Sequence, residues 1–215
     1  MMKTTLAFII ILLLPACASA ALPADDDSLD VLFTGDVMLG RDVARVIKNS
    51  GADALFTPSI DSLFASADAV VANLECPATD IESPLNKRFV FRASPDVLPV
   101  LRRHGVTHLN LANNHSIDQG RRGLTDTYRN ILYAGMTPLG YGENAAEAAR
   151  PQLLATPVRP VYMLSSLLVM SENYVSMASR SGVCESSVGV LCDTIVALRR
   201  RCPTACIIVS LHWGT

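Results

Sequence analysis

The feature that most constrains the fold of this chain is the alternation of continuously apolar runs with segments of helical spacing. The apolar runs cover residues 29–35, 68–75, 106–112, 159–169 and 205–213. The segments of helical spacing cover residues 42–51, 57–67, 94–105, 121–135 and 186–201. Strands that are apolar throughout, rather than at every second residue, are typical of a parallel sheet covered on both faces. The pattern therefore predicts an α/β protein with a largely parallel sheet.

Local signals mark where several of these helices begin. Thr57 and Ser94 each precede a proline, which is the order expected of an N-cap and the first helical turn. Asn144 is followed three residues later by Glu147, which is the spacing of a capping box. Residues 170–186 carry no periodic pattern, so we expect them to form a surface loop.

Length and composition favour one folded domain. The chain has 215 residues, of which 50% are hydrophobic and 18% charged, and this excludes a disordered protein. Basic residues number 18 and acidic residues 20, so the charge balance gives no sign of nucleic-acid binding.

The first 20 residues have the composition of a secretory signal peptide. An apolar run over residues 6–14 is too short to span a membrane with ease, and small residues follow it. Cleavage after residue 20 would leave an acidic leader, residues 21–28, before a domain over 29–215. A lipoprotein signal that ends before Cys17 is the alternative, and it would anchor the protein through this residue. Both interpretations predict an exported protein of the periplasm or cell envelope.

Six cysteines are compatible with an oxidising compartment. Four of them lie close together in the sequence: Cys184, Cys192, Cys202 and Cys206. We expect one or two disulfides within this group, in a pairing that the sequence does not fix. The alternative is a zinc site, although spacings of seven, nine and three intervening residues match no common zinc pattern. Cys76 stands apart and is expected to be a buried thiol.

Polar side chains stand where four separate apolar runs end. They are Asp36, Asn73, Glu75, Asn113, Asn114, His115 and His212. Ligands of open α/β sheets bind outside the carboxyl ends of the strands, where these side chains would meet. Carboxylate oxygen, amide oxygen and imidazole nitrogen are ligands for zinc, manganese or iron. The strand ends therefore predict a metal site or a polar active site.

Each of these residues also has a purely structural interpretation. Asp36 can cap the following helix, although it stands several residues early, and Glu75 can pair with an arginine. Asn114 can hold a left-handed turn, and His212 can be a hydrogen-bonded core histidine. Turn chemistry accounts for one such strand end, but it explains four together poorly.

Several motifs, in order, resemble the CapA/PgsA family of bacterial capsule and poly-γ-glutamate synthesis proteins. The motifs are GDVMLGR (35–41), NLECP (73–77), FVFRASP (89–95), LANNHSIDQG (111–120), GYGENAAEAARP (140–151) and HWG (212–214). The resemblance implies a metallophosphatase-like α/β/β/α sandwich of two packed sheets with helices outside. It also implies up to two divalent metal ions, manganese, zinc or iron, which hold the attacking water and a phosphate.

The resemblance assigns roles to individual residues. Asp36 would bind one metal and take part in catalysis, Glu75 would bridge, and Asn114 and His212 would bind the second metal. His115 would be the general acid. The substrate would be contacted by Arg41, Arg92 and Asn73. The two arginines suit this role because guanidinium groups bind phosphate or carboxylate by paired hydrogen bonds. A surface ion pair is the alternative for both arginines.

Two departures from the family pattern affect these expectations. Phosphoesterases usually have an Asp-x-His first motif, whereas Asp36 is followed by Val37 and Met38, so one metal ligand is missing. The family normally continues past HWG into a histidine-rich HPH motif, but this sequence stops at Thr215. We therefore expect a domain that is incomplete at its C-terminus, through natural truncation or because the sequence is a fragment, with an incomplete ligand set.

Three functions fit these observations. The first is an exported protein of capsule or poly-γ-glutamate synthesis, with a polyanionic polymer and membrane-bound synthases as partners. The second is a metal-dependent phosphoesterase or related hydrolase that acts outside the cytoplasm. The third is an α/β binding domain without metal. Family membership says less about the reaction than the site does.

Overall fold

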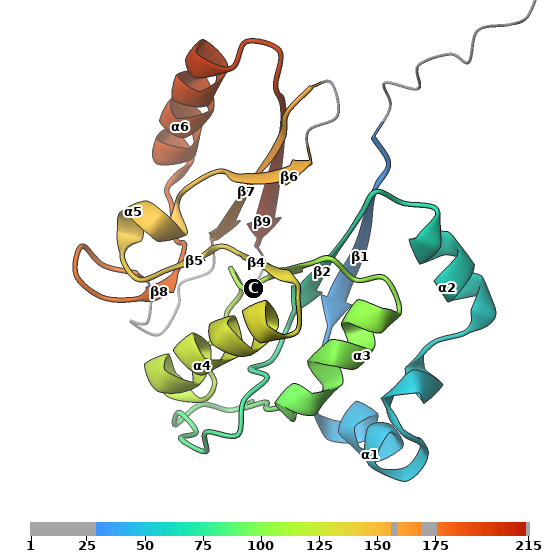
Figure 1. Ribbon diagram of the computed structural model, residues 1–215. Helices are drawn as coiled ribbons and strands as arrows, with labels where there is room; N and C mark the ends of the chain where they lie inside the picture. The colour runs from blue at the N-terminus through green and yellow to red at the C-terminus, as the bar shows by residue number, and fades with distance from the viewer. Residues whose placement is uncertain (1–28, 156–158, 169–175, 214–215) are drawn as a thin grey trace, which may run out of the picture.

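The computed structural model describes residues 29–155, 159–168 and 176–213 (Figure 1). The predicted signal peptide, the leader and Cys17 lie outside the described residues, as does part of the expected 170–186 loop. Among the described residues, no helix combines the length and the hydropathy that a membrane span requires.

The first sheet is parallel, with the strand order β1-β2-β3-β4. Its strands are β1 (Val31–Val37), β2 (Ala69–Leu74), β3 (His108–Asn110) and β4 (Thr137–Leu139). Strand β2 is buried along almost its whole length, which explains its continuously apolar sequence. The predicted parallel sheet is therefore confirmed, although β4 was not among the predicted strands.

Helices connect these strands and pack on one face of the first sheet (Figure 1). They are α1 (Arg41–Ser50), η1 (Ala52–Leu55), α2 (Pro58–Ala65), η2 (Pro95–Val97), α3 (Leu98–Arg103) and α4 (Gly120–Tyr133). The predicted caps are present: Thr57 Oγ1 accepts a hydrogen bond from the N–H of Ile60, and Ser94 Oγ from that of Asp96. The segment 94–105 begins as a 3₁₀ turn because Pro99 has no N–H to donate to the carbonyl four residues earlier.

The second sheet has the strand order β6-β7-β9. Its strands are β6 (Gln152–Ala155), β7 (Val161–Leu167) and β9 (Cys206–His212). Strand β9 runs parallel to β7, and β6 antiparallel to it. Helix α6 (Val188–Arg201) covers the outer face of this sheet, and Ser187 caps it (Figure 1).

A small third sheet joins β5 (Tyr141–Gly142) to β8 (Gly182–Val183), beside the short helix α5 (Ala145–Ala148). The expectation of a loop throughout residues 170–186 is wrong for its described part. Strand β8 is buried there, and two residues are too few to show a periodic pattern. At α5, Asn144 accepts the N–H of Glu147 as predicted, but the Glu147 carboxylate accepts the N–H of Glu143 rather than that of the cap.

Three hydrophobic clusters separate four layers. The first cluster lies between the helices and the first sheet, the second between the two sheets, and the third between the second sheet and α6. Representative members are Leu98, Leu109 and Leu124 in the first, Val71, Leu139 and Met163 in the second, and Leu164, Leu191 and Leu198 in the third. The predicted α/β/β/α layering is therefore confirmed.

Strand β1 contains a bulge just before its polar end. Phe33 pairs with Val71 and Asp36 pairs with Asn73, so β1 has one more residue than β2 between the two pairs. Gly35 lies within the bulge and has a φ of 75°, a backbone conformation that glycine adopts without steric strain. Since paired residues of parallel strands face the same side, the bulge places Asp36 on the side of Asn73, which faces the second sheet.

The five described cysteines are free thiols, so the expectation of disulfides among Cys184, Cys192, Cys202 and Cys206 is not met in the described residues. Cys184 is buried, with its Sγ 3.4 Å from Ser186 Oγ, whereas Cys192 and Cys206 are exposed on α6 and β9. No cysteine belongs to a metal-ligating group of the described residues, so the zinc alternative finds no support there either. Cys76 is a buried thiol, as predicted.

Candidate metal centre

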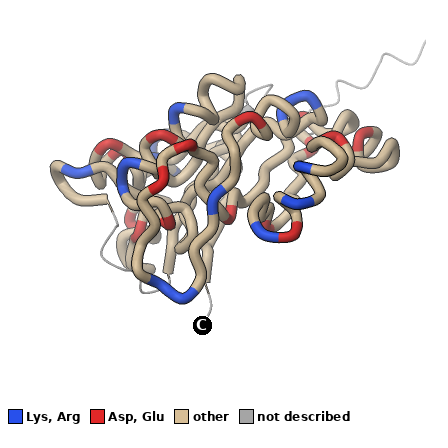
Figure 2. Tube along the Cα trace, turned by 90° about the horizontal axis from the view of Figure 1, so that it is seen from below, with Lys and Arg blue, Asp and Glu red and all other residues tan. Residues whose placement is uncertain are grey.

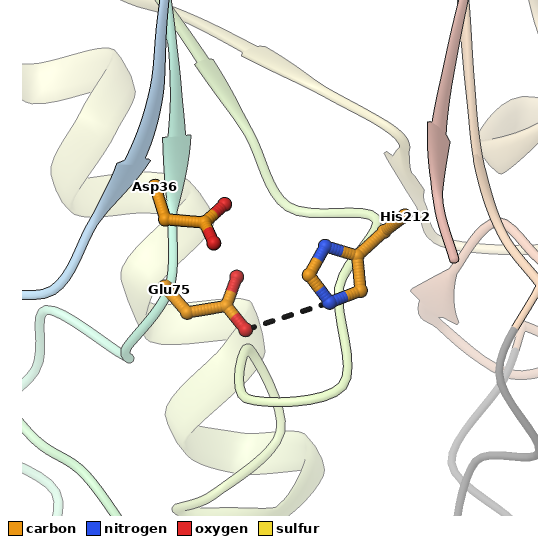
Figure 3. A group of neighbouring side chains, drawn as sticks. All are labelled: Asp36, Glu75 and His212. Carbon is orange, nitrogen blue, oxygen red and sulfur yellow. Dashed lines mark ion pairs between the residues drawn. The ribbon is translucent and has the colours of Figure 1, made fainter. Parts of the chain in front are cut away.

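Three predicted ligands come together where the two sheets meet. Asp36 comes from the end of β1, Glu75 directly follows β2, and His212 is the last residue of β9. One ligand atom from each lies within 4.8 Å of the others, and His212 Nε2 is 3.5 Å from Glu75 Oε1 (Figure 3). Two carboxylates and one imidazole at this separation fit a divalent cation such as zinc or manganese.

The fold places each of these side chains by a different local device. The bulge pairs Asp36 with Asn73, whereas regular pairing would set it beside Leu74, a fully buried residue of the helical side. The N–H of Glu75 donates to the carbonyl of Val37, which holds the two strand ends together. The carbonyl of His212 accepts the N–H of Leu168, so the β7–β9 ladder extends to the site.

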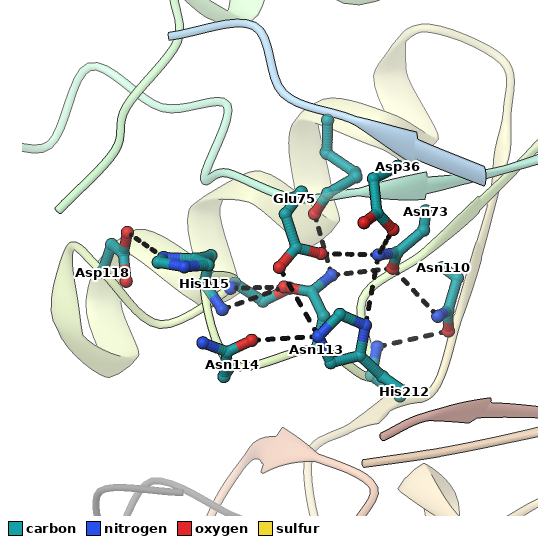
Figure 4. A network of polar contacts seen from close by, with 12 residues as sticks. Asp36, Asn73, Glu75, Asn110, Asn113, Asn114, His115, Asp118 and His212 are labelled. Carbon is teal, nitrogen blue, oxygen red and sulfur yellow. Dashed lines mark hydrogen bonds and ion pairs between the residues drawn. The ribbon is translucent and has the colours of Figure 1, made fainter. Parts of the chain in front are cut away.

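Asn73 links the two carboxylates. Its Nδ2 lies 2.7 Å from Asp36 Oδ1 and 2.5 Å from Glu75 Oε2, and 3.5 Å from His212 Nδ1 (Figure 4). Its Oδ1 accepts hydrogen bonds from the side-chain amides of Asn110 and Asn113. The amide of Asn73 is therefore engaged by protein partners, which gives this residue a positioning role. A contact of Asn73 with substrate stays a prediction.

Asn113 organises the loop that follows β3; it was among the polar residues at the predicted strand ends, but the sequence assigned it no role of its own. It is completely buried, and its Nδ2 also donates to the carbonyl of Leu74. Its Oδ1 accepts from the N–H of His115 and from both the N–H and the hydroxyl of Ser116. The next residue, Asn114, is an asparagine too, so the residue type alone could not show which of the two holds the loop.

Asn114 and His115 occupy the rim of the cluster. Asn114 Oδ1 is 3.0 Å from His212 Nε2, so these two predicted ligands of the second metal lie side by side (Figure 4). His115 Nδ1 is 2.9 Å from Asp118 Oδ2. Asp118 was not among the predicted site residues; it is completely buried, pairs with Lys87 Nζ at 2.9 Å and accepts the N–H of Phe91. A histidine followed three residues later by an aspartate is the signal that marks this pair.

The electrostatics of the cluster favour a cation. Burial raises the pKa of the Glu75 carboxyl, and the neighbouring Asp36 carboxylate adds to this effect. His212, His115 and the hydrogen bond from Asn73 oppose it without cancelling it. A cation between the carboxylates would oppose both effects, because it favours the charged form of Glu75.

The two predicted arginines differ in their relation to the cluster. Arg41 is exposed, has a φ of 51°, and places its guanidinium 5.7 Å from the ring centroids of both Phe89 and Phe91. Phe91 in turn lies 4.4 Å from the His115 ring, so Arg41 adjoins the rim. The described contacts of Arg92 lie elsewhere, with the carbonyl of Thr79 and, at 3.9 Å, with Glu82. The structure therefore brings Arg41 toward the site but gives Arg92 a surface ion pair.

A cavity of about 200 Å³ opens beside the ligands. Its walls come from strands of both sheets. They include Phe33, Gly35, Asp36, Asn73, Asn110, Met163, Ser210 and His212. A small group bound here would contact the Asp36 carboxylate on one side and β9 on the other.

Comparisons with known proteins find relatives that match most of this chain. The chain is 26% identical over 193 residues to the "PGA biosynthesis protein CapA" of Bacillus subtilis (strain 168), covering 88% of this chain and 50% of that protein. It is 27% identical to the "Probable polyglutamine synthesis accessory protein Rv0574c" of Mycobacterium tuberculosis, covering 88% of this chain and 61% of that protein. The chain thus spans about half to two thirds of the length of these relatives.

Solved structures of nucleotidases share the fold at low sequence identity. NAD nucleotidase (NadN) of Haemophilus influenzae superposes with a TM-score of 0.52 at 11% identity, over 87% of this chain and 34% of that one. A putative 5'-nucleotidase of Staphylococcus aureus gives 0.51 at 13% identity, over 87% and 38%. These similarities establish a metallophosphatase-like fold and nothing more specific. The profile of the family "Bacterial capsule synthesis protein PGA_cap" matches residues 30–215, and the chain therefore belongs to that family.

Proposed function

We propose that this chain is an exported protein of capsule or poly-γ-glutamate synthesis that binds a divalent metal ion at the edge between its two sheets. The observation that carries the metal site is the convergence of Asp36, Glu75 and His212 from three strands of two sheets. Family membership supports the link to polymer synthesis. A polyanionic polymer and membrane-bound synthases are the partners that this role calls for.

Export is part of the proposal. It is supported by the apolar run and small residues of the first 20 positions, which have the composition of a secretory signal. Cleavage after residue 20 leaves a protein of the periplasm or cell envelope, and lipidation at Cys17 anchors it there. The intact mass of the protein from its native cells distinguishes the two, because lipidation adds the mass of the acyl chains and makes Cys17 the first residue.

Asp36, Glu75 and His212 would hold the metal, with Asn114 as the next donor in reach. When bound, a divalent cation supplies Lewis-acid polarisation of a substrate oxygen. Asn73 contributes by keeping both carboxylates oriented through hydrogen bonds from one amide. Such support for metal ligands is worth about 10–100-fold in metal affinity.

A metal-dependent phosphoesterase or related hydrolase is the second candidate, and the pairing of His115 with Asp118 favours it. The buried Asp118 carboxylate accepts from Nδ1 of His115, which leaves Nε2 to hold or deliver a proton. The Lys87 ammonium keeps Asp118 paired, and the Phe91 ring limits the rotation of the imidazole. This arrangement suits a general acid that protonates a leaving group.

The test is a calorimetric titration of the full chain with Mn²⁺ and Zn²⁺. We expect one or two ions to bind, and Glu75→Gln and His212→Ala to weaken binding about tenfold or more. His104→Gln is the matched control, because His104 contacts Asp53 and Asp61 away from the cluster. Unchanged affinity in both site variants would reject the metal centre.

The functional candidates are separated by two further measurements. If the metal-loaded chain hydrolyses no phosphoester or amide substrate with any divalent metal, the hydrolase fails. If deletion of the gene leaves the surface polymer of the cells unchanged, the role in polymer synthesis fails. The two outcomes are independent, so either function can stand without the other.

A further inference from the structure

A cavity beside α4 is lined by arginines, and none of its lining residues belongs to the proposed metal centre. In the view of Figure 2, basic and acidic residues are interspersed along the described chain, so a cavity lined mainly by positive charges differs from the rest of that surface. The cavity measures about 390 Å³. Its lining residues are Ile81, Arg121, Arg122, Thr125, Asp126, Arg129 and Ser181.

The charge of this cavity is positive because three arginines line it beside a single acid, Asp126, whose hydrogen-bond partners are neutral. Asp126 Oδ2 accepts hydrogen bonds from Thr79 Oγ1 and from Asn130 Nδ2. Arg122 and Arg129 stand four residues before and three residues after Asp126, which are spacings that allow helical ion pairs. Nevertheless, neither arginine forms an ion pair with any carboxylate in the described part of the chain. Both guanidinium groups are therefore available to a ligand.

The spacing of these arginines sets the size of that ligand. Arg122 and Arg129 are seven residues apart on one helix, which separates their backbones by about 10 Å along the axis. A ligand with two acidic groups would pair with both guanidinium groups at once. An extended acidic chain presents such groups at intervals along its length, so two of its carboxylates would meet the two arginines. The hydroxyls of Thr125 and Ser181, 3.4 Å apart, line the wall beside them.

We propose that this cavity binds the carboxylates of an extended acidic chain, with Arg122 and Arg129 as its main contacts. Guanidinium groups bind carboxylates through two parallel hydrogen bonds, which gives orientation as well as attraction. The inference deepens the proposed function, on which it rests for the choice of an acidic polymer as the ligand. It assigns the recognition of that polymer to α4 rather than to the metal-binding edge of the sheets.

The experiment is a fluorescence anisotropy titration of the full chain against a labelled synthetic glutamate oligomer. We expect the double substitution Arg122→Gln with Arg129→Gln to raise the dissociation constant roughly tenfold, since two charge-assisted contacts are lost. The matched control removes the same charge from elsewhere, through Arg45→Gln with Arg200→Gln on α1 and α6. An equal loss in both double variants would overturn the proposal, because net charge alone would then explain the binding.

Two further arms identify the ligand and the site. Inorganic phosphate is added as a competitor, and full displacement of the oligomer at equal concentration would show a single-anion site and overturn the proposal.

The second arm is the variant Asp36→Asn, which is expected to leave oligomer binding unchanged. If Asp36→Asn abolishes binding while the α4 double variant retains it, the oligomer binds at the metal centre, and this inference fails without harm to the proposed function. If Mn²⁺ binding fails but the α4 effect stands, the metal centre fails alone.

Folding of the variants is checked by thermal unfolding. Arg122 and Arg129 are exposed side chains, so their substitution is expected to leave the melting temperature unchanged. The variant Arg122→Lys with Arg129→Lys keeps the charge but loses the paired hydrogen-bond geometry. It is expected to bind with intermediate affinity, and wild-type affinity in this variant would contradict the role of the guanidinium geometry.

Discussion

The Nδ1 atom of His115 lies 2.9 Å from the Oδ2 atom of Asp118, whose side chain is completely buried. A carboxylate in this position fixes both the rotation and the tautomer of the imidazole, as oriented histidines of other enzymes require. The pair is formed within one loop, three residues apart, and Asn113 holds the turn that brings the two residues together.

Replacement of Asp118 by asparagine tests whether this orientation matters. If the chain is a hydrolase, Asp118→Asn is expected to lower kcat about 10²-fold or more while KM stays close to that of the wild type. The measurement is steady-state turnover of a generic phosphoester with Mn²⁺ present. Asp96→Asn, at an exposed carboxylate, serves as control. A KM effect without a kcat effect would instead place Asp118 in substrate binding.

Asn73 is expected to support the metal through its two hydrogen bonds to Asp36 and Glu75. Asn73→Ala should therefore weaken Mn²⁺ binding about 10–100-fold, measured by calorimetry. Asn130→Ala removes an asparagine whose partners, Ala78 and Asp126, lie outside the cluster, and it should leave the affinity unchanged. Equal affinities of the Asn73 variant and the wild type would show that the carboxylates orient themselves.

Substitution of Asn113 is expected to lower the free energy of unfolding more than substitution of Asn114. Asn113→Ala leaves the carbonyl of Leu74 and the N–H groups of His115 and Ser116 without their partner in a buried site. We expect a loss of about 3 kcal/mol in the free energy of unfolding, measured by urea denaturation. Asn114→Ala removes a half-buried side chain whose carbonyl contacts His212, and should cost less than about 1 kcal/mol. Similar losses for the two would contradict this division.

His104 links folding stability to pH. Burial alone lowers the pKa of His104, but its hydrogen bonds to Asp61 and Asp53 outweigh burial, and the pKa is raised above its ordinary value. A raised pKa means that the charged form stabilises the fold. This contribution is fully present below the unfolded pKa of about 6.5 and is lost as pH rises through the higher folded value.

The measurement is the urea midpoint of wild type and His104→Gln between about pH 5.5 and pH 8.5. The substitution should destabilise the protein more at the acidic end than at the alkaline end. His108 is the control of opposite sign, since burial lowers its pKa, so its contribution is present at high pH and lost as pH falls. A uniform loss across the range in His104→Gln would refute the linkage.

The cysteines should separate into two classes of reactivity. Burial raises the pKa of Cys76 to about 12, and burial also raises the pKa of Cys184, so both remain protonated and inaccessible. Cys192 and Cys206 are exposed. Brief alkylation at about pH 8 followed by peptide mass mapping should label the exposed pair and spare the buried pair. Labelling of Cys76 at the rate of Cys192 would show that the region around Cys76 opens readily.

Much of the fold was predictable because its strands are long and apolar. Strands β2, β7 and β9 are recognisable as apolar runs, and the parallel order follows from the helices between them. Strands β4 and β8 were missed, since three or two residues are too few to establish a period. Their positions are set by pairing with β3 and β5, which is tertiary information.

The candidate site was predictable from chain position, but its organisation was not. Asp36, Glu75 and His212 were identified because each ends a strand, and that reasoning needs no knowledge of side-chain contacts. The roles of Asn113 and Asp118 depend on which buried groups need partners, and a sequence does not display those groups. The proposed disulfides failed for the same reason, because closeness along the chain does not bring thiols together in space.

The bulge in β1 makes the backbone conformation of one glycine as important to the site as the ligands themselves. With the bulge, the Asp36 carboxylate faces the second sheet; if the same residues paired regularly from Phe33 onward, Asp36 would stand beside Leu74 and face the helical core. Replacement of Gly35 by a β-branched residue, which disfavours its φ of 75°, would thus act as a phase error in the strand. It would remove a metal ligand from the site while every ligand residue stays in the sequence, and a search for those residues alone would still find them all.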